Sequence, residues 1–257
     1  MIPKTIHYCW FGRGEKPELA QKCINSWKKC CPDYQIIEWN EDNTDIASCP
    51  TFVQEAMKKK IYAFASDYVR YKAVYEHGGI YLDTDVELLK SLDPFLQNSA
   101  YFGFCKKEKV NSGVGFGAEK GLSFLRELME IYENEELVKD GAICFETNTN
   151  REKAVFLRHG LISNGETQTL DNGVRIYAEE YFSPYDYRTN KFVKTEQTVS
   201  IHWWNTSWKK NVIEAQKKGK MRRRITSLFA VPLKAAKLVL GEEKYRRMRE
   251  KILKRFT

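Results

Sequence analysis

Residues 65–87 read ASDYVRYKAVYEHGGIYLDTDVE, and this stretch predicts a helix, a sharp turn and a short strand in succession. Aromatic and aliphatic residues recur in its first half near the 3.6-residue period of a helix. The pair Gly78 and Gly79 ends that helix, because glycine adopts a left-handed or sharply turned backbone without steric cost. The apolar run 80–82 then has the character of a strand. We therefore expect an α/β domain organised around this unit.

Four charged residues of this stretch are candidates for chemistry. Asp67 and Arg70 are three apart, so they project from one face of the helix. Asp83 and Asp85 follow the strand, and residues two apart on a strand point the same way. Both carboxylates can then meet one cation, and hard oxygen ligands suit Mg²⁺ or Mn²⁺. A lone Asp-x-Asp is also typical of an ordinary solvated turn, so the pair by itself leaves that alternative open.

A second string, residues 199–208 (VSIHWWNTSW), places a histidine on a short apolar strand. Neutral imidazole is a common metal ligand, so His202 is a candidate to complete a set with Asp83 and Asp85. A single histidine on a strand is usually structural, and the three tryptophans of this string are as easily explained by closure of the core. On the residues alone, both explanations stay open.

The chain begins with an alternation of strand and helix. We expect a buried strand at residues 2–10, a helix with an N-terminal proline at 17–31 and a second strand at 34–39. In open α/β sheets the ligand crevice lies outside the carboxyl ends of the strands. Trp10 stands at such an end, where it can either stack on a nucleotide base or cap the core. We expect His7, inside the strand, to be a hydrogen-bonded core residue.

Farther along, we expect strands at residues 101–105 and 174–182 and a helix at 122–132. The glycines of NSGVGFG, residues 111–117, lack the spacing and the downstream Lys-Ser/Thr of a phosphate-binding loop. We therefore expect that segment to be a strand at which a ligand or another backbone comes close. The stretch 140–172 carries little pattern.

The composition is that of a folded chain, because 42% of the 257 residues are hydrophobic and 13% are aromatic. Its net charge of +8 is unevenly distributed. Residues 209–257 hold 17 Lys or Arg against 4 Asp or Glu, a net of +13, whereas residues 1–208 hold 25 against 30, a net of −5. We therefore expect a catalytic domain at 1–208 that is not built to hold a polyanion, followed by a basic appendage.

The appendage, residues 209–257, combines basic blocks with apolar residues at helix-like spacing. Its apolar run is too short to span a bilayer, so we expect a basic amphipathic helical tail that lies on an anionic membrane surface through residues 217–256. A solvated helical hairpin and a nucleic-acid-binding segment are the alternatives. The chain shows no long apolar stretch near its start and no CxxC spacing among seven cysteines. We therefore expect a cytoplasmic protein with reduced thiols, peripheral on the inner face of the cell membrane.

The combination of Asp67, Arg70, the Gly-Gly break, Tyr81 and the Asp-x-Asp pair resembles glycosyltransferase family 32, the DXD-motif sugar transferases. That family includes capsular-polysaccharide and yeast-type mannosyl transferases, and the clostridial glucosylating toxins carry a related string. The resemblance covers most of residues 1–208 and is strongest at IPKTIHYCWFG, SDYVRYKAVYEHGGIYLDTDVE and SIHWWNTSW. It implies a GT-A type fold, with a Rossmann-like nucleotide-binding sheet and flanking helices. The chain departs from the family at residues 144–148, where a common Thr-Gly-Pro turn is absent.

The resemblance also implies roles for individual residues. Those implied to ligate Mn²⁺ or Mg²⁺ are Asp83, Asp85 and His202, although the first Asp of such motifs often faces the ribose instead. Those implied to be catalytic are Asp67, Arg70 and Asp85, with the first two holding sugar hydroxyls. Those implied to bind the donor are Trp10, Asp67, Arg70, Tyr81, Asp83, Asn111, Asn205, Ser207 and Trp208.

The expected function is that of a metal-dependent retaining glycosyltransferase. It would move a hexose from a UDP-sugar, UDP-galactose or UDP-glucose, to a hydroxyl of a lipid-linked oligosaccharide in capsule or cell-envelope polysaccharide synthesis. A divalent cation would neutralise the leaving diphosphate, and no nucleophile stands at a persuasive spacing, so we expect a front-face transfer. Two alternatives remain open: a non-enzymatic membrane-surface binding protein with a degenerate transferase fold, and a phosphohydrolase that uses the Asp pair.

Overall fold

The computed structural model describes residues 1–106, 108–139, 142–144, 146–205, 213 and 243. Residues 1–137 and 145–208 form one compact unit, to which the description below applies. A second unit takes in residues 138–144 and 209–257, and its described part includes a hairpin of β8 (Val138–Lys139) and β9 (Ala142–Ile143). Within the described residues, no helix combines the length and the apolar character that crossing a membrane requires.

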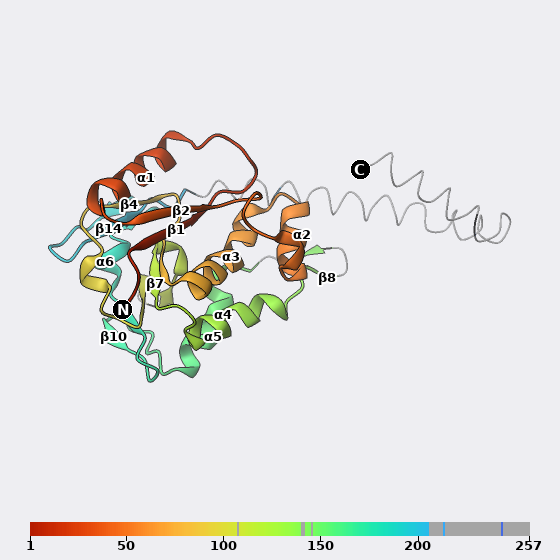
Figure 1. Cartoon of the computed structure of the whole chain (residues 1–257). Helices are drawn as coiled ribbons and strands as arrows, with labels where there is room; N and C mark the ends of the chain where they lie inside the picture. The colour runs from red at the N-terminus through yellow and green to blue at the C-terminus, as the bar shows by residue number, and fades with distance from the viewer. Residues whose placement is uncertain (107, 140–141, 145, 206–212, 214–242, 244–257) are drawn as a thin grey trace. The chain divides into compact units, whose positions relative to one another are not determined.

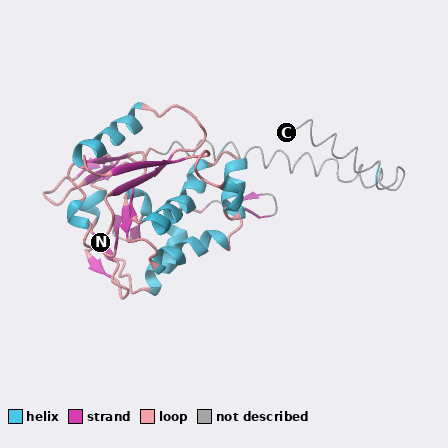
Figure 2. Cartoon of the chain, in the orientation of Figure 1, coloured by secondary structure: helices cyan, strands magenta, loops and turns pink. Residues whose placement is uncertain are grey.

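A mixed sheet runs through the first unit (Figures 1 and 2). Its strands, in spatial order, are β10 (Gln168–Thr169), β11 (Arg175–Tyr177), β5 (Ala100–Lys106), β7 (Phe116–Ala118), β3 (Gly79–Tyr81), β1 (Thr5–Cys9) and β2 (Gln35–Trp39), with β6 (Lys109–Val110) beside β5. β1 pairs in parallel with β2 and β3, and β11 in parallel with β5, whereas β7 is antiparallel to both β3 and β5. The α/β class and the strand–helix–strand start are confirmed.

Helices lie on both faces of this sheet (Figure 1). They are α1 (Glu18–Cys30), α2 (Thr51–Lys58), α3 (Tyr62–His77), α4 (Ser123–Glu133), α5 (Asn148–Arg158) and the short α6 (Glu179–Phe182). Side chains of β1 alternate between the faces. Tyr8 packs edge-on against Trp27 of α1 at 5.5 Å, while His7 points to the α3 side, where its Nε2–H donates to the carbonyl of Gly78 at 2.8 Å. The strand is buried on both sides because both faces are covered.

Two smaller elements complete the region of interest. β14 (Ser200–His202) pairs antiparallel with β4 (Val86–Leu88), so the second string of the sequence lies beside the Asp-x-Asp segment. β12 (Tyr185–Asp186) and β13 (Lys191–Phe192) form a hairpin. Three 3₁₀ turns lie elsewhere in the unit: η1 (Ile46–Ser48), η2 (Asp93–Phe95) and η3 (Ser112–Val114).

The helix–turn–strand unit forms as predicted. α3 packs against α2, α4 and β1, so it is buried around most of its circumference, and this encloses its polar residues Asp67 and Arg70. The turn after it requires glycine. Gly79 has φ +111°, and a Cβ there would lie 2.7 Å from the carbonyl oxygen of Thr5.

His7 is a satisfied core histidine, as expected. Besides the bond to Gly78, its Nδ1 accepts from the indole N–H of Trp39 at 3.1 Å. These two partners select the neutral tautomer that carries its proton on Nε2. Burial lowers the pKa of His7 to about 4, since the charged form would lose hydration and one hydrogen bond.

Several expected elements are wrong in detail. Residues 111–117 are not a continuous strand, because Asn111 folds back to accept from the amide of Gly113 and so starts η3. The strand expected at 174–182 ends at Tyr177, and α6 follows it. Helix α5 occupies part of the segment that showed little pattern. Cys9, Cys23, Cys31, Cys49 and Cys105 are buried in the described part of the chain.

Candidate functional site

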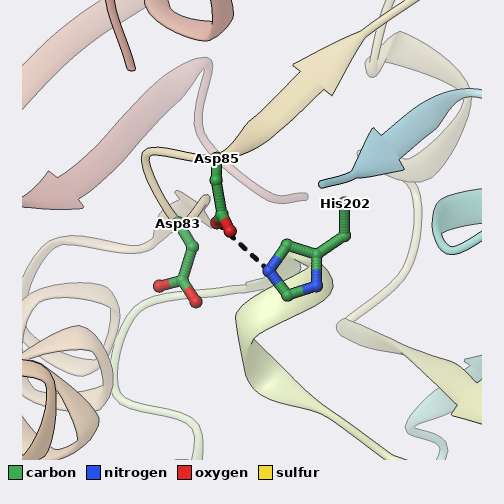
Figure 3. A group of neighbouring side chains, drawn as sticks. All are labelled: Asp83, Asp85 and His202. Atoms are coloured by element: carbon green, nitrogen blue, oxygen red, sulfur yellow. Dashed lines mark hydrogen bonds and ion pairs between the residues drawn. The ribbon is translucent and has the colours of Figure 1, made fainter. Parts of the chain in front are cut away.

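Asp83 and Asp85 lie where β3 ends and β4 begins, next to His202 at the end of β14 (Figure 3). One potential ligand atom from each of the three lies within 4.8 Å of the others. The predicted juxtaposition is therefore present, but its predicted cause is wrong. Asp85 is in a turn rather than on the strand, so a reversal of the chain, and not strand alternation, brings the two carboxylates together.

The carboxylate of Asp85 is held on both oxygens. His202 Nε2 lies 3.1 Å from Oδ1, and the backbone amide of Asn205 donates to Oδ2 at 2.7 Å. The amide of Trp203 donates to the Asp85 carbonyl at 3.0 Å. The chain leaving β14 is thus bound to the Asp-x-Asp turn, although the two segments are far apart in sequence.

The three side chains suit a divalent cation. Two carboxylates and an imidazole are a donor set that Mn²⁺ accepts. The ring nitrogen of His202 that faces the carboxylates is Nε2 (Figure 3), whereas the buried Nδ1 has no hydrogen-bond partner among the described residues. The geometry therefore fits the divalent ion expected from the sequence, without distinguishing Mn²⁺ from Mg²⁺.

Burial and neighbouring charges shift the pKa values of all three side chains of the cluster. Desolvation raises the pKa of Asp83 above its ordinary value, and the Arg70 guanidinium offsets part of that rise. Desolvation also acts on Asp85, but the charge and hydrogen bond of His202 outweigh it and the pKa of Asp85 is lowered. Burial disfavours the charged form of His202, yet Asp85 outweighs this effect and its pKa is raised. Asp85 and His202 therefore stabilise each other's charged forms.

Arg70 connects the predicted residues to one another. Its Nη2 lies 3.0 Å from Asp67 Oδ1 and 3.3 Å from Asp83 Oδ1, so one guanidinium joins the helix to the Asp-x-Asp turn. Only 5% of the Arg70 side chain is exposed. Burial raises the pKa of Asp67 to about 7, with Arg70 opposing the rise. The predicted shared face of Asp67 and Arg70 is confirmed, and the Arg70 guanidinium forms ion pairs with the carboxylates of Asp67 and Asp83.

Tyr81 and Gly113 shape the surroundings of Asp83. The Tyr81 hydroxyl donates to Asp83 Oδ1 at 2.9 Å, and its ring lies 5.0 Å from the Arg70 guanidinium carbon. Gly113 of η3 passes so close that a Cβ on it would lie 2.5 Å from Asp83 Oδ2. Glycine is thus the residue that this approach permits. The expectation that another group comes close to Gly113 was right, although the segment is a turn.

The remaining residues expected to bind the donor have different surroundings. The Trp10 indole donates to the carbonyl of Gly14 at 2.7 Å and lies beside the Lys16 ammonium. The Asn111 side chain is 6% exposed, and its Oδ1 already accepts from Gly113 and from Asn148. Asn205 is exposed, and its backbone rather than its side chain meets Asp85.

The other two residues expected to bind the donor, Ser207 and Trp208, lie outside the described residues. The same holds for the basic tail, apart from Ile213 and Glu243.

Sequence reasoning missed three residues that lie behind Arg70. Ser112 Oγ is 3.0 Å from Arg70 Nη1, Asn148 Nδ2 donates to Ser112 at 3.1 Å, and the fully buried Glu152 lies 3.4 Å from Ser112. Asn148 is in the segment marked by the absent Thr-Gly-Pro turn, so that departure was a usable signal. Glu152 gave none, because an acid among Arg and Lys on an amphipathic helix is usually solvated.

The sequence matches a protein-family model over residues 17–102, described as the glycosyltransferase sugar-binding region containing a DXD motif. The match contains Asp67, Arg70 and the Asp-x-Asp turn, so it coincides with the buried ion pairs and the carboxylate cluster described above.

The curated relatives of this chain include sugar transferases. The chain is 30% identical over 134 residues to inositol phosphoceramide mannosyltransferase 3 of Schizosaccharomyces pombe, covering 50% of this chain and 36% of the relative. It is 32% identical over 115 residues to the uncharacterized glycosyltransferase L373 of Acanthamoeba polyphaga mimivirus, covering 43% and 46%. It is 23% identical over 227 residues to the mannosyl phosphorylinositol ceramide synthase CSH1 of Saccharomyces cerevisiae, covering 82% and 56%. The chain thus spans roughly a third to a little over a half of these relatives.

The comparison with solved structures found the PaToxG glycosyltransferase, at 17% identity and a TM-score of 0.43. The alignment covers 52% of this chain and 61% of that one. A glycosyltransferase involved in the glycosylation of the major capsid of PBCV-1 aligns at 11% identity and a TM-score of 0.44, covering 82% and 98%. These scores are too low to support any inference about the site. Residues 17–102 thus match the sugar-binding region of the DXD-motif glycosyltransferases, and they lie within a mixed α/β architecture of the class that the sequence predicted.

Proposed function

We propose that this chain is a metal-dependent retaining glycosyltransferase that moves a hexose from a nucleotide sugar to a hydroxyl of a lipid-linked oligosaccharide. One observation supports the proposal above all others. Asp83, Asp85 and His202 converge beside the buried Asp67–Arg70 ion pair, and four of these five residues lie within the family match. Such a constellation can receive a nucleotide diphosphate on one side and hold the sugar on the other.

In this proposal Asp83, Asp85 and His202 hold a divalent cation, Mn²⁺ or Mg²⁺. When bound, such an ion offsets the negative charge that develops on a departing diphosphate. The chain itself contributes a preorganised cluster. Hydrogen bonds from Asn205 and Tyr81 hold the carboxylates in place before any ligand arrives, so little reorganisation is needed when the donor binds.

Asp67 and Arg70 are assigned to the donor sugar. Because Arg70 already bonds to Asp67, Asp83 and Ser112, we infer that its main task is to keep these groups in position, and that Asp67 offers the carboxylate that a sugar hydroxyl meets. Trp10, Asn111, Asn205, Ser207 and Trp208 remain proposed donor contacts. The helix face thus orients the sugar while the Asp-x-Asp turn receives the diphosphate.

We also propose retention of anomeric configuration through a front-face transfer, in which a diphosphate oxygen helps to deprotonate the acceptor. NMR analysis of the product linkage tests this directly. An α-linked donor should give an α-linked product, and a β-linked product would refute retention.

Two donor classes compete. UDP-galactose and UDP-glucose are the donors favoured by the sequence resemblance. A mannosyl donor is the second candidate, because two of the relatives above are named as mannosyl transferases of inositol phosphoceramide. Epimers that differ at one hydroxyl are distinguished by one or two side chains. The assay must therefore include gluco, galacto and manno donors.

The acceptor is proposed to be lipid-linked and to belong to capsule or cell-envelope polysaccharide synthesis, with the protein cytoplasmic and peripheral on the inner face of the membrane. The support is the excess of basic residues in 209–257, which would bring the active site to an anionic surface. Deleting residues 209–257 should move the protein from the membrane fraction to the soluble fraction. Unchanged partitioning would contradict the anchoring role.

The test of the activity is nucleotide release with Mn²⁺ and without acceptor, across UDP-glucose, UDP-galactose and GDP-mannose. Slow release from at least one donor, abolished by chelation of the metal, supports the proposal. Hydrolysis of a generic aryl phosphate would favour the phosphohydrolase instead. Metal binding that no nucleotide sugar enhances, together with no release, would favour a non-enzymatic membrane-surface protein.

A further inference from the structure

A chain of hydrogen bonds runs from the site into the interior. Arg70 Nη1 bonds to Ser112 Oγ at 3.0 Å, Ser112 Oγ lies 3.4 Å from both carboxylate oxygens of Glu152, and Tyr132 donates to Glu152 Oε1 at 3.0 Å. Glu152 has no exposed surface, so it cannot touch a substrate. A buried carboxylate is costly, and one placed directly behind the site calls for a reason.

The donors and acceptors around Ser112 can be counted. A serine hydroxyl has one proton to donate and two lone pairs that accept. Arg70 and Asn148 both donate to Ser112 Oγ, at 3.0 Å and 3.1 Å, because a guanidinium and an amide nitrogen have only protons to offer. Both lone pairs are then used. The single proton of Ser112 is donated to Glu152, and the Tyr71 hydroxyl is the other acceptor beside it. The carboxylate therefore fixes the direction of the hydroxyl.

The second branch of this network reaches the turn beside Asp83. The Nδ2 group of Asn148 donates to Ser112 and, at 3.0 Å, to Asn111 Oδ1. Asn111 Oδ1 also accepts from the amide of Gly113 at 2.7 Å, and Gly113 is the residue in closest approach to Asp83. The orientation of one hydroxyl thus bears on both Arg70 and the η3 turn.

We propose that Glu152 is a positioning residue: by accepting the proton of Ser112 it directs the serine lone pairs to Arg70 and Asn148, and so holds Asp67 and Asp83 in their working geometry. This inference rests on the proposed function for its activity readout. It assigns Glu152 a role as a hydrogen-bond acceptor, not as a charge, and that distinction can be tested.

Substitutions at Glu152 separate the two roles. Glu152→Gln keeps an acceptor oxygen for Ser112 and can turn its amide nitrogen to Tyr132, so it should retain turnover within about threefold. Glu152→Met is similar in size and has no such acceptor, so kcat should fall by about 30-fold while the KM for the donor changes little. Equal losses in both variants would show that charge is what matters, and would overturn the proposal.

Two further variants separate positioning from packing. Tyr132→Phe removes a hydroxyl that donates to Glu152 and leaves Ser112 in place, so it should lower Tm and leave kcat within about threefold. Ser112→Ala should lower kcat as much as Glu152→Met, and the double variant should lose little more, because both act on the same hydroxyl. A Tyr132→Phe loss as large as that of Ser112→Ala, or additive losses in the double variant, would show a general structural effect. This pair of single variants still decides the question if Glu152→Met does not fold.

The hydrogen bonds from Glu152 through Ser112 to Arg70 are called the relay here. A failure of this relay can be told apart from a failure of the proposed function. If the unmodified chain releases nucleotide from no donor, the proposed function fails, whatever the variants do. The relay is then tested by crystal structures of the unmodified chain and of Ser112→Ala. The guanidinium of Arg70 should leave its place between Asp67 and Asp83 in the variant, and an unmoved guanidinium would contradict the relay. Glu127→Gln, on α4 and paired with Arg158 and His159, is the matched surface control for both measurements.

Discussion

The candidate site has two halves that are built in different ways. The acidic half, from Asp67 to Asp85, comes from one continuous helix–turn–strand segment, and the family match covers it. The supporting half comes from η3, α5 and β14, which are distant from each other in sequence. The carboxylates of the site are encoded locally, whereas His202 and the groups that hold the carboxylates in place are brought to them by the fold.

Arg70 is the residue in which the two halves meet. Its Nη2 bonds to the acidic half and its Nη1 to Ser112 of the supporting half. A buried guanidinium is tolerable only when its hydrogen bonds are well placed, because the cost of desolvation is otherwise not recovered. The supporting half is therefore part of what allows the acidic half to exist inside the protein.

The strongest test of the acidic half is Asp85→Asn. This change removes one carboxylate from the cluster and weakens the pairing with His202, so we expect nucleotide release to fall by about 10³-fold. Mn²⁺ binding, followed by electron paramagnetic resonance, should weaken in parallel. Asp171→Asn, on the exposed surface, is the control. Full activity in Asp85→Asn would remove the acidic half from the mechanism.

The pH dependence of stability tests the contact between His7 and the Gly-Gly turn of the acidic half. His7 holds the carbonyl of Gly78, and its pKa is about 4 in the folded protein against 6.5 for the free side chain. Between these values the unfolded chain binds the proton first, so the free energy of unfolding should decrease as the pH falls from 6.5 to 4, by about 3 kcal/mol in all.

Urea unfolding at several pH values measures this decrease. His7→Gln should remove that part of the slope, even if it lowers stability at neutral pH. The same slope with and without the histidine would show that other groups cause it.

Arg70→Lys tests the junction of the halves. An ammonium cannot reach Ser112, Asp67 and Asp83 together as the planar guanidinium does. We expect turnover to fall by about 30-fold, which corresponds to a loss of about 2 kcal/mol of transition-state stabilisation, and we expect a lower Tm. Arg126→Lys, which alters a surface pair with Glu133 on α4, should change neither quantity appreciably. Similar results for the two variants would mean that the junction is dispensable.

Gly113→Ala tests whether the supporting half must approach Asp83 closely. The added methyl group would lie 2.5 Å from Asp83 Oδ2, so either the carboxylate or the turn must move. We expect about tenfold lower turnover, since overpacking of this kind costs about 1–3 kcal/mol. Gly14→Ala, where nothing lies within 4 Å, is the control. If both variants behave alike, the close approach at Gly113 has no consequence for function.

Prediction from sequence succeeded where the pattern was local. The helix before the Gly-Gly turn, the turn itself and the strand after it were all identified, as were the shared helix face of Asp67 and Arg70 and the placement of His7 in the core. Each of these depends on residues a few positions apart, or on a periodicity that only one element satisfies. The meeting of His202 with the Asp-x-Asp turn was anticipated through the family resemblance, not through the residues themselves.

Prediction failed at two turns and at one buried side chain. The convergence of Asp83 and Asp85 was attributed to strand alternation, although a turn was the open alternative, and the turn is what the structure has. Residues 111–117 were assigned to a strand, although the Asn111 side chain caps a 3₁₀ turn there. Glu152 gave no signal in the sequence, and only the packing of α5 shows that it has no exposed surface. The turns at Asp83 and Asn111 are local features that the pattern did not distinguish from strands, whereas the burial of Glu152 comes from other parts of the chain.

The sequence by itself determined the α/β class, the helix–turn–strand segment that ends in the acidic residues and the type of ion that these residues can accept. These follow from periodicity, from the freedom of glycine and from the chemistry of carboxylates. The tertiary structure alone decided that Ser112, Asn148 and Glu152 stand behind Arg70, and that the backbone of Asn205 holds Asp85. The physical reason is that a buried charge must be matched by hydrogen bonds, and the fold brings those partners from segments that no local pattern connects.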